Sequence, residues 1–195
     1  MIRKLQLSDI DNCVAIHQKN SMNWSHNAQI GADHLKNIYK VILTSDESFG
    51  VGFFNDEDRM VCFITATSDY FLTMEKMFKL VSSKHIGKIF KQVLRDPNEL
   101  FDMMESRFVI PKVIKKMDIR PHLLTWHNNF NEKEHAIAPM LVMRRALREL
   151  KALGFGACTA QVDANNQRPN NYYRKTGARL RYSSRWNNVY EVQTI

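Results

Sequence analysis

The segment with the clearest chemical potential lies near the C-terminus, from residue 166 to 178. It runs Asn-Gln-Arg-Pro-Asn-Asn-Tyr-Tyr-Arg-Lys-Thr-Gly-Ala, with Tyr173 near its centre. A phenol has an ordinary pKa of about 10, so it stays protonated at neutral pH and can give a proton to a leaving group. The structural alternative is a tyrosine that packs its ring in the core and leaves its hydroxyl at the surface. Tyr172 lies on another side of the same predicted helix and is the fallback acid.

A histidine in a predicted strand is the second candidate. Residues 122–128 run His-Leu-Leu-Thr-Trp-His-Asn. In a strand, Thr125 and His127 share one face of the sheet, and Trp126 and Asn128 share the other. An imidazole in the middle of a sheet can serve as a base. A lone histidine in a strand is more often simply hydrogen-bonded in place, so both interpretations stay open.

Hydrophobic periodicity predicts the elements that must position these residues. The expected order is a strand (2–7), helices (10–17, 32–43), strands (48–54, 60–66), a helical insert (about 71–117), a strand (122–128), a helix (139–153), a strand (157–162), a helix (166–176) and two strands (179–183, 188–195). This order predicts an α/β fold, with a mixed sheet and helices on both faces. A length of 195 residues fits one domain, residues 1–195.

Local signals predict where several elements begin and end. Ser8 and Asp11 resemble a capping box at the start of the first helix. Pro97 and Pro111 are expected to break the insert into two or three helices. The insert is basic and carries Met and Phe, so it either covers the core or lies on a membrane or a partner.

The segment around Tyr173 also resembles the last strand-helix-strand signature of the GNAT acyltransferases, Asn-x-x-Ala-x-x-x-Tyr-x-Lys-x-Gly-Phe. Asn166, Tyr173, Lys175 and Gly177 match it, while Pro169 and Ala178 replace the Ala and the Phe. The element order matches as well, apart from the insert between the third and fourth strands. Similar inserts occur in GNAT enzymes that resemble sugar-amine acetyltransferases. The resemblance implies a largely antiparallel GNAT-type sheet.

The resemblance further implies an N-acetyltransferase that moves an acetyl group from acetyl-CoA, or another acyl-CoA, to a primary amine of a small molecule such as an amino sugar. The amine would attack the thioester directly, which requires only that the two reactants be aligned. Tyr173 would protonate the departing thiolate and His127 would be the base. Residues 124–129, which include Asn128 and Asn129, would pair with the pantetheine arm. Asn166 would cap the last helix and contact CoA.

The loop that should hold the CoA pyrophosphate departs from the family pattern. GNAT proteins use Arg/Gln-x-x-Gly-x-Gly/Ala at the start of the long helix, where backbone N–H groups and the helix dipole bind the phosphates. The aligned residues here are Glu-His-Ala-Ile-Ala-Pro, from Glu134 to Pro139, with neither glycine. The phosphates would then be held by the backbone N–H groups of Ile137, Ala138, Met140 and Leu141. Arg144 or Arg145 would supply the positive charge.

Three interpretations of this loop stay open. CoA binds through that cradle, or the acyl donor is an acyl-carrier protein, or the fold persists as a GNAT-like binding module without activity. In addition, Asn131 and Glu134 have capping-box spacing, which would start the helix earlier and kink it at Pro139.

Composition sets the remaining expectations. The formal net charge is +8 and the isoelectric point about 9.5, which favours anionic partners such as a polyphosphate or a nucleic acid. No RNA-recognition motif is present, so nucleic acid is not expected. Cys13, Cys62 and Cys158 lie among apolar neighbours, which indicates reduced core residues and a cytoplasmic protein. No run reaches the roughly 18 apolar residues of a membrane span and no ligand spacing suggests a metal. A homodimer is compatible with all of this.

Overall fold

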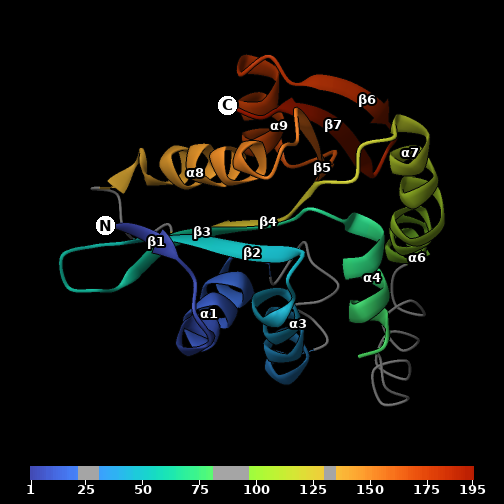
Figure 1. The fold of residues 1–195 in the computed structure, drawn as a ribbon. Coiled ribbons are helices and arrows are strands. Elements are labelled where there is room, and N and C mark those ends of the chain that lie inside the picture. Colours follow the sequence, from blue (N-terminus) through green and yellow to red (C-terminus); the bar gives the residue numbers. More distant parts are fainter. Residues whose placement is uncertain (22–30, 81–96, 130–134) are drawn as a thin grey trace.

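The computed structural model describes residues 1–21, 31–80, 97–129 and 135–195. Within them a seven-stranded sheet, in the order β1-β2-β3-β4-β5-β7-β6, separates two layers of helices (Figure 1). Every neighbouring pair of strands is antiparallel except β4 and β5, which are parallel. The predicted α/β class, the mixed and largely antiparallel sheet and the helical insert between the third and fourth strands are therefore confirmed.

The element bounds follow the hydrophobic pattern closely. The strands are β1 (Ile2–Lys4), β2 (Ser48–Phe54), β3 (Met60–Thr67), β4 (His122–Asn128), β5 (Ala157–Asp163), β6 (Arg179–Ser183) and β7 (Asn187–Gln193). The helices are α1 (Ile10–Ser21), α3 (Ala32–Thr44), α4 (Tyr70–Phe78), α6 (Pro97–Met104), α7 (Ile110–Met117), α8 (Ala138–Ala152) and α9 (Gln167–Lys175). Gly154 and Gly177 follow α8 and α9 with φ of 91° and 79°, the left-handed conformation that commonly ends a helix.

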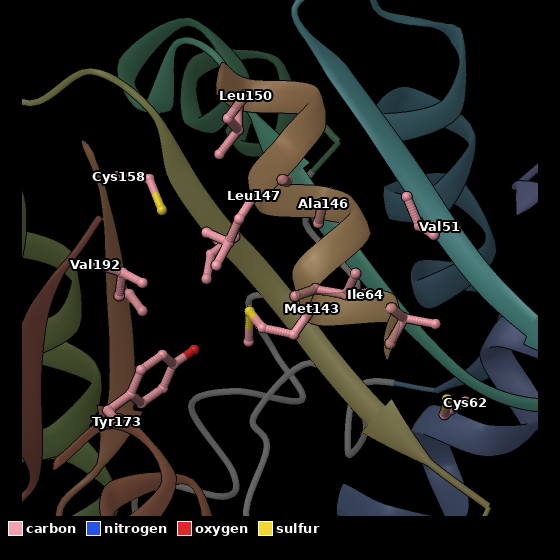
Figure 2. Close-up of a cluster of buried hydrophobic side chains, with 14 of the residues drawn as sticks. Val51, Cys62, Ile64, Met143, Ala146, Leu147, Leu150, Cys158, Tyr173 and Val192 are labelled. Atoms are coloured by element: carbon pink, nitrogen blue, oxygen red, sulfur yellow. The ribbon is translucent and has the colours of Figure 1, made fainter. Parts of the chain in front are cut away.

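Each face of the sheet has its own hydrophobic core. The face under α8 and α9 packs against the apolar side of α8, and Figure 2 shows Met143, Ala146, Leu147 and Leu150 turned toward the strands. The opposite face packs against α1 and α3, where Leu35, Ile38 and Ile42 are buried. Because both faces are covered, β3 is buried at every position. The three cysteines are free and buried, as predicted.

The described part of the insert after residue 96 packs beside the end of the sheet (Figure 1). Residues Glu105–Val109 form a π turn between α6 and α7, and Pro111 follows in the first turn of α7. The α-helix is thus interrupted just before Pro111, as predicted, and Pro111 lies in the first turn of a separate helix, where a residue without an N–H is tolerated. Helix α6 begins at Pro97. Predictions for residues 81–96 lie outside the described residues.

One buried carboxylate anchors this insert to the sheet. Glu105 accepts hydrogen bonds from the Tyr182 hydroxyl at 2.6 Å, the Ser184 hydroxyl at 2.7 Å and Asn187 Nδ2 at 2.8 Å. Asn187 Nδ2 also donates to Asp102 of α6 at 2.7 Å. These bonds join α6 and the π turn to β6, β7 and the loop between them, so they fix the wall that the insert presents to the sheet.

Two predictions about helix starts are wrong. The capping box lies at Gln6 and Asp9, not at Ser8 and Asp11, because Asp9 accepts the Gln6 N–H at 2.7 Å while paired with Arg3. A short 3-10 turn, Leu7–Asp9, therefore precedes α1. Helix α8 begins at Ala138, which places Pro139 in its first turn and not at a kink. The Asn131–Glu134 box lies outside the described residues. Nowhere in the described chain is a helix long and apolar enough to cross a membrane.

Candidate active site

The parallel strands β4 and β5 separate soon after they begin. Their pairing consists of His122 with Thr159 and Leu123 with Ala160. On its other side β4 stays paired with β3 up to Asn128, but the register shifts at Leu124, which has no Cα partner. A β-bulge of this kind bends the strand that carries it. The edge of β4 beyond Leu123 is therefore open toward β5.

The separation leaves a cavity of about 160 Å³, which we call the split cavity. It is lined by Leu123, Leu124, Thr125, Trp126, Gln161, Val162, Asp163, Asn166, Pro169 and Tyr173. β4, β5 and the start of α9 all contribute to it. The two segments singled out in the sequence, residues 122–128 and 166–178, therefore both line the split cavity.

Tyr173 forms part of the wall of the split cavity. Its side chain is buried, stacked on Tyr190 at 5.1 Å between ring centroids and edge-on to Trp126 at 6.3 Å. Figure 2 shows its hydroxyl pointing, in that view, toward Met143 of α8. Burial, followed by the nearby Cys158, Tyr172 and Tyr190, raises the pKa of Tyr173 well above its usual value of 10.0. The phenol therefore stays protonated at neutral pH and can give a proton, but it cannot act as a base.

A second cavity, of about 330 Å³, lies on the other side of the split, next to the insert. This insert cavity is lined by His17, Ile38, Tyr70, Met74, Met77, Asp102, Ser106, His122, Leu124, Thr125, Gln161, Asp163 and Asn187. Four residues line both cavities: Leu124, Thr125, Gln161 and Asp163. The two spaces therefore meet where β4 and β5 diverge, and Asp163 is the acid at that junction.

His127 does not line either cavity within the described part of the chain. Its ring stacks on that of His17 at 4.1 Å and lies 5.5 Å from the Phe63 ring. Burial and the neighbouring His17 hold the pKa of His127 well below 6.5. The ring that reaches the insert cavity on this side belongs to His17, whose pKa burial lowers to about 4.

Thr125 and His127 do share one face of the sheet, as predicted. The Thr125 hydroxyl lies 2.7 Å from that of Thr65, and the nearby Tyr39 hydroxyl lies 2.7 Å from His17 Nδ1. Trp126 faces the other way and meets Tyr172 edge-on at 4.9 Å. A polar chain on the α1 and α3 side and an aromatic cluster on the α8 and α9 side thus flank the same strand.

The start of α8 offers fewer free donors than the sequence suggested. The N–H groups of Met140 and Leu141 both donate to the Ile137 carbonyl, at 3.0 and 3.2 Å. Pro139 has no N–H. The N–H groups of Ile137 and Ala138 are therefore the ones in this turn that the helix does not use. Ala138 is buried, whereas Ile137 is 66% exposed. Any anion held here would meet one or two N–H groups and not a full cradle.

The two arginines of α8 differ in their surroundings. Arg145 pairs with Glu149 at 2.8 Å, and Glu149 also pairs with Lys4 at 2.9 Å, on the β1 side of the helix. Arg144 lies close enough to Tyr172 that its charge opposes the burial-driven rise in the pKa of that phenol. Of the two arginines, Arg144 is therefore the one that lies close to α9.

The three asparagines of the predicted site occupy different settings. Asn166 is the N-cap residue of α9, as predicted, but its side chain makes no cap bond. Its carbonyl accepts from Asn170 Nδ2 at 2.7 Å. Asn166 nevertheless lines the split cavity, as a CoA contact requires. The Asn128 carbonyl accepts from Asn20, and Asn129 Oδ1 accepts from Lys19 at 3.2 Å. The end of β4 therefore contacts the end of α1 through the Asn128 backbone and the Asn129 side chain.

Sequence reasoning missed several residues that shape this site: His17, Asp102, His122, Gln161 and Asp163. A carboxylate at the end of a strand next to a helix start was the available signal for Asp163. The others come from elements whose proximity no sequence spacing reveals. Across the described residues, no group of three or more His, Cys, Asp or Glu side chains is arranged to hold a metal ion.

The fold, with its sheet split between β4 and β5, is the GNAT acetyltransferase fold. Among solved structures, PaiA N-acetyltransferase from Thermoplasma acidophilum, in complex with coenzyme A, superposes with a TM-score of 0.61 at 12% identity, covering 99% of this chain and 98% of that one. The ribosomal-protein-S18-alanine N-acetyltransferase from Escherichia coli gives 0.58 at 11% identity, covering 100% and 93%. An aminoglycoside 6'-acetyltransferase type Ii gives 0.58 at 10% identity, covering 100% and 97%. No family model and no curated sequence matches the chain.

Proposed function

We propose that the protein is an N-acetyltransferase that transfers an acetyl group from acetyl-CoA to a primary amine of a small molecule. The observation that carries this proposal is the meeting of two cavities at the split between β4 and β5. The split cavity brings Tyr173 to one side of the junction, and the insert cavity opens the other side to a second ligand. A bisubstrate reaction by direct attack needs this arrangement, in which donor and acceptor approach one point from opposite sides.

The open edge of β4 supports a role in holding the acyl donor. Beyond Leu123 its backbone groups on the β5 side have no ladder partner in β5, so they can pair with an extended amide-containing chain. Trp126 Nε1 and Asn128 Oδ1 are buried without a hydrogen-bond partner among the described residues. Such orphaned groups are costly unless a ligand completes them. These features fit the pantetheine arm of a CoA thioester.

Each group then has a defined task. The thioester supplies an activated acyl carbon, and the amine arrives through the insert cavity. As the nitrogen–carbon bond forms and the carbon–sulfur bond breaks, the amine loses a proton and the sulfur gains one. Tyr173 is the donor to sulfur, because its phenol is protonated, lies in the wall of the split cavity and has no hydrogen-bond partner among the described side chains. His127, the base implied by family resemblance, lies behind His17 and lines neither cavity among the described residues, so the amine proton passes to solvent in the insert cavity.

The protein offers fewer hydrogen-bonding groups to the phosphates of CoA than to its pantetheine arm. The N–H groups of Ile137 and Ala138, the positive end of α8 and the Arg144 side chain are the groups available to them. We therefore expect acetyl-CoA to bind in the micromolar range or more weakly. An amino sugar stays among the candidate acceptors.

Calorimetry with acetyl-CoA, followed by thiol release with a panel of primary amines, tests the proposal. Saturable CoA binding together with amine-dependent thiol release is the expected result. Absence of binding at millimolar CoA would exclude CoA as donor. The remaining interpretations would then be an acyl-carrier-protein donor, detectable by transfer from an acetylated carrier protein, and a binding module without activity.

A further inference from the structure

The junction between the two cavities contains a side chain that can take up a proton. The described residues that line both cavities are Leu124, Thr125, Gln161 and Asp163. Leu124 is apolar, Thr125 carries a hydroxyl and Gln161 carries an amide, and none of these groups takes up a proton at neutral pH. Asp163, at the end of β5, is therefore the base among the residues that both ligands would meet.

Within the described chain the Asp163 carboxylate has no cationic partner. Its Oδ1 accepts the Asn165 N–H at 2.7 Å, in the local turn that leads from β5 to α9. No described lysine or arginine lines either cavity. An asparagine makes the same kind of turn without a charge, so the turn does not explain why a carboxylate is present. A half-buried negative group in this setting favours a cationic ligand.

A buried asparagine fixes the position of Asp163 relative to Tyr173. Asn170 Nδ2 donates to the Asp163 carbonyl at 2.8 Å, and Asn170 Oδ1 accepts from the Tyr190 hydroxyl at 2.9 Å. The Tyr190 ring in turn stacks on that of Tyr173. Asp163 and Tyr173 both line the split cavity. The proposed proton donor and this carboxylate are thus held in one frame, and catalysis by alignment of reactants depends on such fixed geometry.

Loss of water at the junction favours proton transfer from an ammonium group to this carboxylate. Burial raises the pKa of Asp163, although the Asn165 N–H opposes the rise, and the same desolvation lowers the pKa of an amine. An ammonium–carboxylate pair is thereby shifted toward a free amine beside a carboxylic acid. Burial has the opposite effect on His17, because it lowers the pKa of that ring to about 4 and weakens it as a base.

We propose that Asp163 binds the ammonium group of the acceptor at the junction and takes the first of the two protons that this nitrogen must lose. The inference rests on the proposed function. The carboxylate becomes a carboxylic acid and then passes the proton to solvent. The free amine forms the nitrogen–carbon bond as the carbon–sulfur bond breaks, and its second proton also passes to solvent. Tyr173 protonates the sulfur and regains a proton from solvent, so each transfer releases one proton overall.

Two amines of similar size that differ in protonation test this role. Ethylamine is an ammonium ion at neutral pH, whereas trifluoroethylamine is largely a free amine, because its fluorines withdraw electrons from the nitrogen. Asp163→Asn should lower kcat/KM for ethylamine by about 100-fold, within the range of general acid–base catalysis. It should change kcat/KM for trifluoroethylamine by less than about threefold, since that amine has no first proton to lose. In an NMR titration without acetyl-CoA, the substitution should weaken ethylamine binding by about tenfold, the contribution of a hydrogen bond to a charged group.

Three controls separate this role from a structural one. Asparagine keeps an oxygen for the Asn165 N–H, so Asp163→Asn should bind acetyl-CoA in calorimetry as the unaltered protein does. Asp56→Asn makes the same substitution at an exposed position between β2 and β3, and it should leave kcat/KM for both amines unchanged. Asp163→Glu retains a carboxylate on a longer side chain and should recover part of the activity with ethylamine.

The results distinguish this inference from the proposed function. An equal loss of activity with both amines in Asp163→Asn would overturn the inference while the acetyltransferase function stands, because a structural role does not depend on the protonation state of the acceptor. Unchanged activity with ethylamine would overturn it as well. If the unaltered protein transfers acetyl groups to no amine, the proposed function and the proton transfer both fail, and the titration alone decides whether Asp163 binds the ammonium group.

Discussion

Leu123 of β4 and Ala160 of β5 are the last paired residues before their two strands diverge. Leu124, which follows immediately, has no partner in β3 either, because the register of β3 and β4 shifts there. One bulge thus releases β4 from β5 while keeping it in the sheet. The result is a cavity on each side of the split, joined by the side chains of Leu124, Thr125, Gln161 and Asp163.

Removing the Tyr173 hydroxyl should impair chemistry rather than binding. We expect Tyr173→Phe to lower kcat for amine-dependent thiol release by about 100-fold, within the range of general acid catalysis, and to leave acetyl-CoA affinity within about threefold. Tyr172→Phe is the matched control, since Tyr172 is adjacent on α9 but does not line the split cavity. Equal effects of the two substitutions would argue against Tyr173 as the acid.

The two arginines of α8 should contribute differently to binding of the CoA phosphates. Arg144→Ala should raise the Kd of acetyl-CoA by about threefold, the effect of a solvent-screened ion pair, and high salt should abolish the difference. Arg145→Ala should have little effect, because Arg145 is engaged by Glu149. Calorimetry at low and high salt measures both. A larger loss in Arg145→Ala would show that the phosphates lie on the β1 side of α8.

The Glu105 carboxylate should be important for stability. Glu105→Gln places an amide NH2 where an oxygen accepts from the Tyr182 hydroxyl, or from the Ser184 hydroxyl and Asn187. We expect the free energy of unfolding to fall by about 1.5–3 kcal/mol, the contribution of hydrogen bonds to a charged group. Tyr182→Phe should cost less, since it removes one bond. Urea unfolding with an unchanged midpoint would contradict this anchoring role.

Acid should destabilise the fold through its buried histidines, which include His17 and His122. The pKa values of His17 and His122 are lowered from 6.5 to about 4 and about 3 by burial. Between pH 6.5 and these values the unfolded chain binds more protons than the folded chain, so the free energy of unfolding falls as pH decreases. Urea unfolding at pH 7.5 and 5.0 measures the loss. His122→Gln should reduce the difference between the two pH values, and an unchanged difference would refute the assignment.

Much of the fold follows from patterns that are local in the chain. The bounds of β2, β3 and α8 were predicted to within about one residue. The strand pattern of residues 48–54 and 60–66 and the helical spacing of residues 139–153 were sufficient for this. These patterns are readable because a buried face imposes its period directly on the sequence. Helix starts were less predictable. Asp9 and not Asp11 completes the cap because it is also paired with Arg3 of β1, which is a tertiary contact.

The sequence by itself determined the order of elements, the GNAT resemblance and the candidacy of Tyr173, since a motif fixes spacing along one helix. Only the tertiary structure decided which residues surround the reaction. It set His127 behind His17, turned Arg144 but not Arg145 toward α9, and brought Asp102 and His122 to the same cavity as Asp163. The physical reason is that these neighbours come from separate elements, whose packing depends on the bulge in β4 and the anchoring of the insert by Glu105.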